Sequence, residues 1–343
     1  STDWPVNRLA RQPIGPSTNR QGYWPCEPAD AVFASQCRKL SPFFLRACRP
    51  YWYMAVVKRT CLPLILLTAK TMQPVFITDL DGTLLGHEDF SFTPIRDDFL
   101  NLLDRGIQII FNSSKTATEI RALCDDLDVK LPFICENGAA LFNADLLVGD
   151  IPLVDTMPSS MVLGTTVEAL MAAWDEAIDP SLRRHCILLD AMEPKAQQRV
   201  LGLAGQQLAR ALDRDFSVLF SFYGPHEVFA DLCSQAAAAG LSVHSGGRVH
   251  CLSGQHDKSS FNTMIRQRCS PPAGKAIIIG FGDSDNDIAL LSQADVACVV
   301  PRPRQPVLQL ADPPPKVITA PQPAPSGWVL AASQALALLE QQQ

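Results

Sequence analysis

The sequence predicts an α/β protein, in which a Rossmann-like core built on a parallel sheet is interrupted by an inserted α+β domain. From Pro74 onward, short apolar runs with high β-propensity alternate with helical stretches, and polar residues follow where each run ends. The same alternation resumes near Lys275 after a middle segment of different texture. We therefore expect the core at 72–157 and 251–343, and the inserted domain at 158–250.

The first part of the core reads as strand, helix, strand, helix, strand. The expected strands are 75–78, 107–111 and 132–135, and the expected helices are 94–105 and 116–127. Because open parallel sheets bind ligands beyond the carboxyl ends of their strands, the polar residues after each strand are candidates for a site.

The remaining elements are expected from the same patterns. They are helices at 165–177 and 193–212, strands at 217–222 and 248–252, a helix at 257–267, a strand at 275–279, an irregular Pro-rich stretch at 301–327 and an Ala/Leu helix at 328–339.

Residues 1–71 are expected to be a poorly ordered extension, because they are rich in Pro, Arg and aromatics and show no sustained period. Their ten Lys or Arg against three Asp or Glu leave a targeting leader open, and the alternative is sequence ahead of a start at Met72. The apolar run 61–69 is shorter than the ~20 residues of a membrane span, so no membrane segment is expected.

The rest of the chain is acidic, with 19 Lys or Arg against 32 Asp or Glu. Nucleic-acid binding depends on clustered Lys and Arg, so a nucleic-acid partner is not expected. The 11 cysteines include no CxxC pair and no zinc-like cluster, which indicates reduced thiols and a cytoplasmic location.

The run DLDGTLL, from Asp79 to Leu85, follows the first apolar strand. Carboxylates at i and i+2 leave a strand end on the same side, so Asp79 can attack while Asp81 handles protons. A plain strand-to-loop turn is the alternative for a bare DxD.

The run GDSDND, from Gly282 to Asp287, follows a second buried strand. Asp283 and Asp287 can converge on one hard cation if a turn or helix starts here, whereas an acidic helix N-cap is the alternative. The run Gly280-Phe281-Gly282 lacks the third glycine of a dinucleotide-binding fingerprint, and two carboxylates there would repel a pyrophosphate. A dinucleotide site is therefore not expected.

Two further residues complete the candidate chemistry. Ser113 ends the second strand, where its hydroxyl could hold a phosphoryl oxygen or simply cap the next helix. Lys258 stands at an expected helix start just after the inserted domain, and alone it would read as a surface lysine.

These motifs occur in the order typical of the haloacid dehalogenase-like hydrolase superfamily, which the chain resembles over about 74–340. The insertion before Lys258 resembles the branch with an α/β cap. The chain is most similar to the mannosyl-3-phosphoglycerate phosphatase family in four runs: SSKTATEI (113–120), ENGAAL (136–141), GGRVHCLSGQHDKS (246–259) and GFGDSDNDIALL (280–291).

The resemblance implies a Mg²⁺-dependent phosphatase that works through an aspartyl-phosphate. It makes Asp79 the nucleophile, Asp81 the general acid and base, and Ser113 and Lys258 the groups that hold the phosphoryl oxygens. The implied metal site comprises Asp79, Asp81 through its carbonyl, Asp283 and Asp287. The implied substrate-binding residues are Ser114, Asn137, Gly138, Arg214, Ser217 and Arg248.

The substrate is expected to be a small phosphorylated sugar, with mannosyl-3-phosphoglycerate first. Glucosyl-3-phosphoglycerate, another sugar phosphate, phosphomannomutase-like transfer and a non-catalytic sugar-phosphate-binding protein remain alternatives. The family often carries Arg-Glu-aromatic-Ser-Glu-Pro-Phe in the cap, where Val218 and Leu219 replace a carboxylate and a proline here. That departure leaves the sugar open, and the oligomeric state is not indicated.

Overall fold

The computed structural model describes residues 72–147, 158–246, 248–272 and 274–341. The expected extension 1–71 lies outside the described residues, as does the run 61–69. The described residues fall within one compact unit, Ala69–Gln343. None of the helices in these described stretches is long and apolar enough to cross a membrane.

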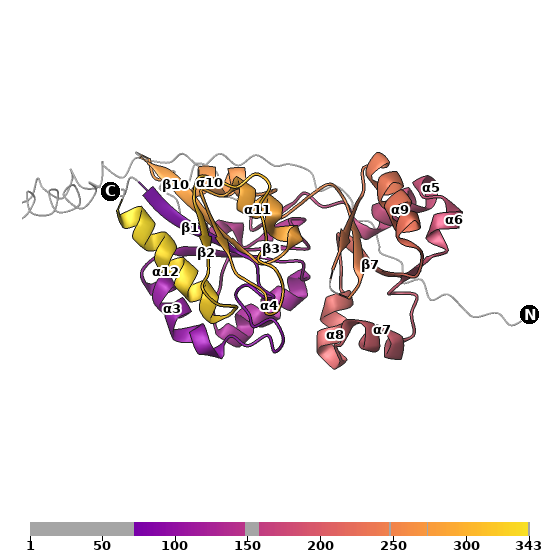
Figure 1. The fold of residues 1–343 in the computed structure, drawn as a ribbon, viewed down its shortest axis with the longest axis horizontal. Coiled ribbons are helices and arrows are strands. Elements are labelled where there is room, and N and C mark those ends of the chain that lie inside the picture. Colours follow the sequence, from indigo (N-terminus) through magenta and orange to yellow (C-terminus); the bar gives the residue numbers. More distant parts are fainter. Residues whose placement is uncertain (1–71, 148–157, 247, 273, 342–343) are drawn as a thin grey trace, which may run out of the picture. The chain divides into compact units, whose positions relative to one another are not determined.

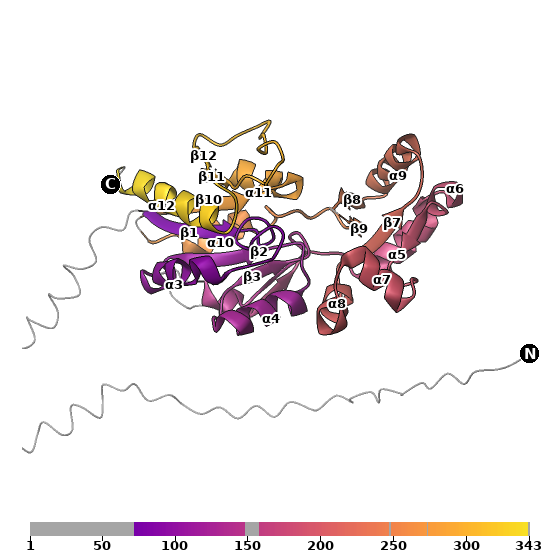
Figure 2. The ribbon, with the colours of Figure 1, turned by 60° about the horizontal axis from the view of Figure 1, so that its bottom comes forward.

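The core is an eight-stranded sheet in the order β12-β11-β10-β1-β2-β3-β4-β5. The six strands from β12 to β3 run parallel, and β4 and β5 add on antiparallel; Figure 2 shows the parallel strands in this order. Their bounds are β1 Met72–Thr78, β2 Gln108–Asn112, β3 Phe133–Cys135, β4 Ala140–Phe142, β5 Ser160–Val162, β10 Lys275–Gly282, β11 Val296–Val299 and β12 Val317–Thr319. The expected α/β class with a parallel sheet is confirmed.

Alternation along the strands decides which helices cover which face. In β1, Phe76 packs with one apolar cluster, and Val75 and Ile77 pack with another on the opposite face. Helices α3 (Arg96–Asp104), α4 (Ala117–Leu127) and α12 (Ser326–Glu340) contribute to the first cluster, and α10 (Asn262–Cys269) and α11 (Ile288–Gln293) to the second (Figure 1). The core is therefore a sheet with helices on both faces. The short 3-10 helix η2 (Thr93–Ile95) directly precedes α3.

The middle of the chain forms a second, four-stranded antiparallel sheet in the order β6-β7-β9-β8. Its strands are β6 Cys186–Leu188, β7 Ser217–Phe222, β8 Ser242–Ser245 and β9 His250–Ser253. One face packs on α5 (Val167–Ala177), α6 (Pro180–Arg183) and α9 (His226–Ala238), which lie together in Figure 1. The other face meets α7 (Pro194–Leu201) and α8 (Gly205–Leu212). We call this α+β unit the cap.

Several elements differ from the sequence expectation, which did not include β4, β5, β6, β8, β11, α6 or α11. The expected helix 193–212 is two helices, because the chain turns at Gly202 with a φ of 68°. The helix expected from 257 begins only at Asn262. The stretch 301–327 contains β12, and α9 was not anticipated. The chain passes from the core sheet to the second sheet after β5 and returns after β9. Both crossings come a few residues later than the expected limits of 158 and 250.

Candidate active site

Polar residues gather where the parallel strands of the core end. Asp79 follows β1, Ser113 follows β2, Glu136 follows β3 and Asp283 follows β10. These strands pair in parallel, so their carboxyl ends share one edge of the sheet. Residues more than 200 positions apart thus meet because of strand order.

Three buried carboxylates form the centre of this edge. Asp79, Asp283 and Asp287 each offer an oxygen, and these oxygens lie within 4.8 Å of one another. Gly82, with a φ of 82°, makes room for them, because a Cβ there would lie 2.7 Å from Asp283 Oδ2. The structure thus brings together three aspartates that the two sequence motifs singled out.

Lys258 is completely buried within this acidic cluster. Its Nζ lies 2.6 Å from Asp79 Oδ1 and 2.6 Å from Asp287 Oδ1. The other oxygen of Asp287 accepts hydrogen bonds from the backbone amides of Asp283 and Ser284, each at 3.0 Å. Asp287 is therefore held at both oxygens by the protein.

The electrostatics of the cluster show an excess of negative charge. Burial raises the pKa of Asp79 well above its usual range, and the Lys258 ammonium only partly offsets the rise. Burial and the neighbouring Asp287 also raise the pKa of Asp283. Although burial disfavours its charged form, Lys258 has a pKa above the usual value because Asp287 and Asp79 stabilise the ammonium. Asp79, Asp283 and Lys258 thus all bind their protons more tightly than usual. This is expected of a site that favours additional positive charge.

Asp283 is also paired with an arginine from beyond β11. Arg302 Nε lies 2.6 Å from Asp283 Oδ2, and the Thr83 hydroxyl donates to Asp283 Oδ1 at 3.3 Å. Arg302 was not expected from the sequence. It stands just past the carboxyl end of a parallel strand, so the rule that selected the other residues would have found it had Val296–Val299 been read as a strand.

Asp81 lies at the edge of the cluster and is paired with Lys115. Lys115 Nζ is 2.7 Å from Asp81 Oδ2 and 3.9 Å from Glu119. In the described part of the chain, Asp81 Oδ1 is buried with no hydrogen-bond partner. One oxygen of this carboxylate is thus held by Lys115, and the other has no partner among the described residues. Lys115 belongs to the run SSKTATEI, but no role was assigned to it from the sequence.

The turns after β2 and β3 bind to each other. Ser113 is buried, and its hydroxyl accepts a hydrogen bond from the Lys115 amide at 3.2 Å. The Asn137 amide donates to the Ser113 carbonyl at 2.9 Å, and Asn286 donates to the Asn137 side chain at 3.1 Å. Gly138, at φ 101°, passes so close to the Asp257 carbonyl that a Cβ would overlap it. Gly138 therefore serves this edge through its backbone.

Glu136 connects the core to the cap. Its carboxylate accepts hydrogen bonds from the backbone amides of Asp215 at 3.1 Å and Phe216 at 3.2 Å, and from the Ser217 hydroxyl. Arg214 donates to Ser217 Oγ at 2.9 Å and to the Ser114 carbonyl at 3.3 Å. Arg214 and Ser217 thus lie beside the core, and Glu136, which the sequence did not single out, positions them.

Arg248 lies away from this group. Its guanidinium donates to the Leu201 carbonyl at the end of α7 and lies against Gly202. That placement caps a helix. The replaced motif residues separate as well: Val218 packs in the cluster with α5 and α9, whereas Leu219 is on the opposite face of β7.

A cavity of about 450 Å³ lies between the cap and the edge of the core sheet where the parallel strands end. Of the expected site residues, it is lined by Asp79, Asp81, Ser114, Asn137 and Arg214. The expected site residues that do not line it are Ser113, Gly138, Ser217, Lys258, Asp283, Asp287 and Arg248, the last of which binds the Leu201 carbonyl. Lys115, Leu219, His244 and Arg302 line it without having been expected.

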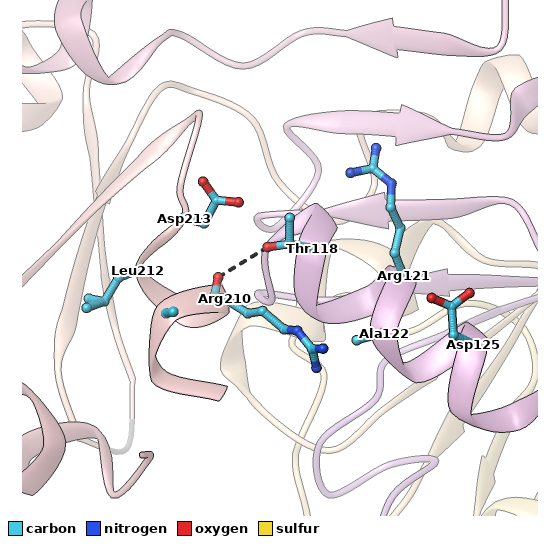
Figure 3. Close-up of a pocket in the computed structure, with 8 residues that line it drawn as sticks. Thr118, Arg121, Ala122, Asp125, Arg210, Leu212 and Asp213 are labelled. Atoms are coloured by element: carbon cyan, nitrogen blue, oxygen red, sulfur yellow. Dashed lines mark hydrogen bonds between the residues drawn. The ribbon is translucent and has the colours of Figure 1, made fainter. Parts of the chain in front are cut away.

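A second cavity, of about 670 Å³, lies between α4 and α8 and contains none of the expected site residues. Figure 3 shows the Thr118 hydroxyl directed at the Arg210 carbonyl, to which it donates at 3.3 Å. Thr116 donates to the same carbonyl at 2.8 Å. These two threonines form a second polar contact between core and cap.

Comparisons with known proteins identify one matching family model and relatives that are named phosphatases. Residues 76–153 match the family model described as haloacid dehalogenase-like hydrolase. A glucosyl-3-phosphoglycerate/mannosyl-3-phosphoglycerate phosphatase of Persephonella marina is 28% identical over 258 residues, covering 74% of this chain and 94% of that protein. A protein of the same name from Methanococcoides burtonii is 26% identical over 235 residues, covering 68% of this chain and 86% of its own length.

Two solved structures share the fold. A phosphatase of the haloalkanoate (HAD) enzyme superfamily from Bacteroides thetaiotaomicron superposes with a TM-score of 0.53 at 15% identity, covering 79% of this chain and 97% of that chain. A protein from Thermoplasma acidophilum gives 0.52 at 14% identity, with 78% and 99% covered. At these identities the likeness concerns the fold alone.

Proposed function

Because this chain is a haloacid dehalogenase-like hydrolase, we propose that it is a Mg²⁺-dependent phosphatase that hydrolyses a sugar-linked phosphate monoester through an aspartyl-phosphate at Asp79. The observation that carries the proposal is the buried cluster of Asp79, Asp283, Asp287 and Lys258 beside a cavity that Asp79 lines.

The donor set fits a divalent cation. Carboxylate oxygens are hard ligands, and three of them converge here from two strand ends. Lys258 and Arg302 together balance only two of the three charges. Burial, and after it the neighbouring carboxylates, raises the pKa of Asp79 and of Asp283. Asp79, Asp283 and Asp287, with the Asp81 carbonyl, would hold the ion. A bound Mg²⁺ supplies positive charge next to the phosphoryl oxygens, which lowers the repulsion between two anions.

Asp79 is the proposed nucleophile. Its carboxylate oxygen forms a bond to phosphorus while the bond from phosphorus to the ester oxygen breaks, giving an acyl phosphate and an alcohol. Lys258 holds the Asp79 carboxylate in place. It stays charged because the carboxylates around it keep its pKa above the usual value. Lys258 and the Ser113 hydroxyl are proposed to hold the phosphoryl oxygens as charge moves.

Asp81 is the proposed general acid and base. In the first step it gives a proton to the departing alcohol oxygen, and in the second it takes one from the water that attacks phosphorus and frees Asp79. Its partnerless Oδ1 supports this role, and Lys115 fixes Oδ2 so that the carboxylate keeps one orientation. The oxygen of the water thus ends in inorganic phosphate, and Asp79 and Asp81 return to their starting forms.

The cap is proposed to select the alcohol. Ser114, Asn137 and Arg214 line the cavity with Asp79, and Ser217 and Gly138 support them from behind. The resemblance and the names of the two relatives favour mannosyl-3-phosphoglycerate, with glucosyl-3-phosphoglycerate as the second candidate because the relatives carry both names. Arg248, tied to α7, is proposed to support the cap and not to contact the sugar.

The test is a phosphate-release assay with Mg²⁺ on the full chain. The esters compared are mannosyl-3-phosphoglycerate, glucosyl-3-phosphoglycerate, sucrose phosphate and hexose phosphates. We expect release of inorganic phosphate from a glycosyl phosphoglycerate, and loss of that release in Asp79→Asn. A sugar-phosphate isomer as the product would favour phosphoryl transfer, and release unchanged in Asp79→Asn would contradict the proposal.

A further inference from the structure

One row of side chains on the cap sheet faces the cavity. Leu219 of β7 is paired with Cys251 of β9, and Cys251 is paired with His244 of β8. Paired residues on neighbouring strands lie on the same face of a sheet. All three residues line the cavity that Asp79 lines, so the row forms the wall opposite the proposed nucleophile.

The wall is mainly apolar. Leu219 packs in a cluster with Leu201 and Ala211, and the partly buried members of that cluster include Leu203, Val249 and Cys251. The members that also line the cavity are Leu201, Leu203, Ala211, Leu219, Val249 and Cys251. We call these six residues the apolar wall. Such a surface is stabilised by contact with an apolar face and gains nothing from hydroxyl groups.

The next row of the same sheet face is polar. Ser217 pairs with Ser253, and Ser253 pairs with Ser242, two residues along each strand from the row of Leu219. Ser217 is bound by Glu136 and Arg214 of the core–cap contact. A ligand extending from Asp79 would therefore meet the Arg214 side chain, which Ser217 holds from behind, and the apolar wall beyond it.

The wall has one polar edge. His244 Nε2 is buried and has no hydrogen-bond partner within the described part of the chain. Ser245 and Gly246 line the cavity beside it. A buried ring nitrogen without a partner is unfavourable unless a ligand or a water supplies one.

We propose that the alcohol released by this enzyme has an apolar face that packs on the wall, with Leu219 and Cys251 as specificity-determining residues and His244 binding one polar group at its edge. The inference rests on the proposed phosphatase function and narrows it. A glycosyl ring offers such a face through its C–H groups, whereas a glycerate or glycerol alone does not. Small, fully polar phosphate esters are then poor substrates.

The test compares two primary alkyl esters that differ in apolar surface, 2-phenylethyl phosphate and glycerol 1-phosphate. In the unmodified protein, kcat/KM should favour the phenylethyl ester by about tenfold or more, as expected when several methylene-sized contacts are gained. Leu219→Ala should reduce this preference by roughly tenfold, mostly through KM, while leaving glycerol 1-phosphate within about twofold.

Val218→Ala is the matched control. Val218 is next to Leu219 and equally buried, at 7% against 8% exposed, but its side chain packs with α5 and α9. Its substrate preference should equal that of the unmodified protein. Equal kcat/KM for the two esters in the unmodified protein, or the same loss of preference in both variants, would overturn the inference.

Failure of the proposed function gives a different result. If no ester releases phosphate, the proposed phosphatase function is wrong. Calorimetric binding of the same two esters to the full chain then still tests the apolar wall. Tighter binding of the phenylethyl ester that is lost in Leu219→Ala would then support the wall alone. Equal binding of both esters would reject it.

Discussion

The ammonium group of Lys258 lies 2.6 Å from the carboxylate of Asp79, although the two residues are 179 positions apart and the lysine is fully buried. Lys258 lies between β9 and α10, and its carbonyl accepts a hydrogen bond from the Asn112 side chain at the end of β2, which holds the lysine at the same edge of the sheet as Asp79. Lys258 also contacts Asp287, so a single cation holds two of the three clustered aspartates.

Replacing Lys258 with methionine should strongly destabilise the protein. The change leaves Asp79 and Asp287 buried without their common partner, and breaking a buried pair from one side costs about 3–5 kcal/mol. Urea unfolding at neutral pH without added metal measures the loss. Lys275→Met is the control, since Lys275 pairs with Asp295 at 57% side-chain exposure and should change the free energy of unfolding by less than about 1 kcal/mol. Equal effects of the two changes would contradict this role of Lys258.

Adding Mg²⁺ should stabilise the folded protein. An ion that binds only the folded state at about 100 times its Kd adds about 2.7 kcal/mol. Asp283→Asn removes a ligand charge and should abolish most of the shift in thermal unfolding. Asp98→Asn, at an exposed position of α3, should leave the shift intact. A full Mg²⁺ shift in Asp283→Asn would place the ion elsewhere.

Binding of Mg²⁺ should weaken as the pH falls. Burial raises the pKa of Asp79 and of Asp283, so the metal-free site retains protons that the cation must displace. A folded-state pKa above the unfolded value favours the metal-free fold at low pH, and that contribution disappears as the pH rises through the folded pKa. Stabilisation by Mg²⁺ therefore grows with pH above the usual carboxyl value of 3.8. Calorimetry in two buffers of different ionisation enthalpy should detect proton release, and its absence would refute the prediction.

Glu136→Gln should loosen the contact between core and cap. The amide of glutamine cannot accept all of the bonds from the Asp215 and Phe216 amides and the Ser217 hydroxyl, and one unpaired buried donor costs about 1–3 kcal/mol. We expect a lower thermal midpoint and a raised KM, with the Mg²⁺ affinity unchanged. Glu227→Gln, on the exposed first turn of α9, should alter none of these quantities. An unchanged KM in Glu136→Gln would show that the cap does not depend on this contact.

The sequence was sufficient to predict the strands whose carboxyl ends carry the candidate site residues. β1, β2 and β10 are apolar runs bounded by polar turns, so their carboxyl ends, and with them Asp79, Ser113 and Asp283, could be located. The placement of Lys258 beside these residues depends on strand order, which local patterns do not encode, and it came from the family resemblance.

Other residues depended on contacts that a linear pattern does not contain. Arg248 resembles a substrate-binding arginine in sequence, yet the break at Gly202 creates a helix end that it caps. Arg302 was hidden in a Pro-rich stretch, because the short strand before it was not recognised. Leu219 and Val218 look equivalent in the chain, and only the alternation of β7 assigns one to the cavity and the other to the helices.

The most direct measurement is detection of the covalent intermediate. The protein is mixed with Mg²⁺ and a glycosyl phosphoglycerate, quenched in acid within a turnover, digested and analysed by mass spectrometry. The mechanism predicts a peptide heavier by one phosphoryl group, with the modification on Asp79 and absent from Asp79→Asn. Turnover without a phosphorylated Asp79, or phosphorylation at another residue, would contradict the account.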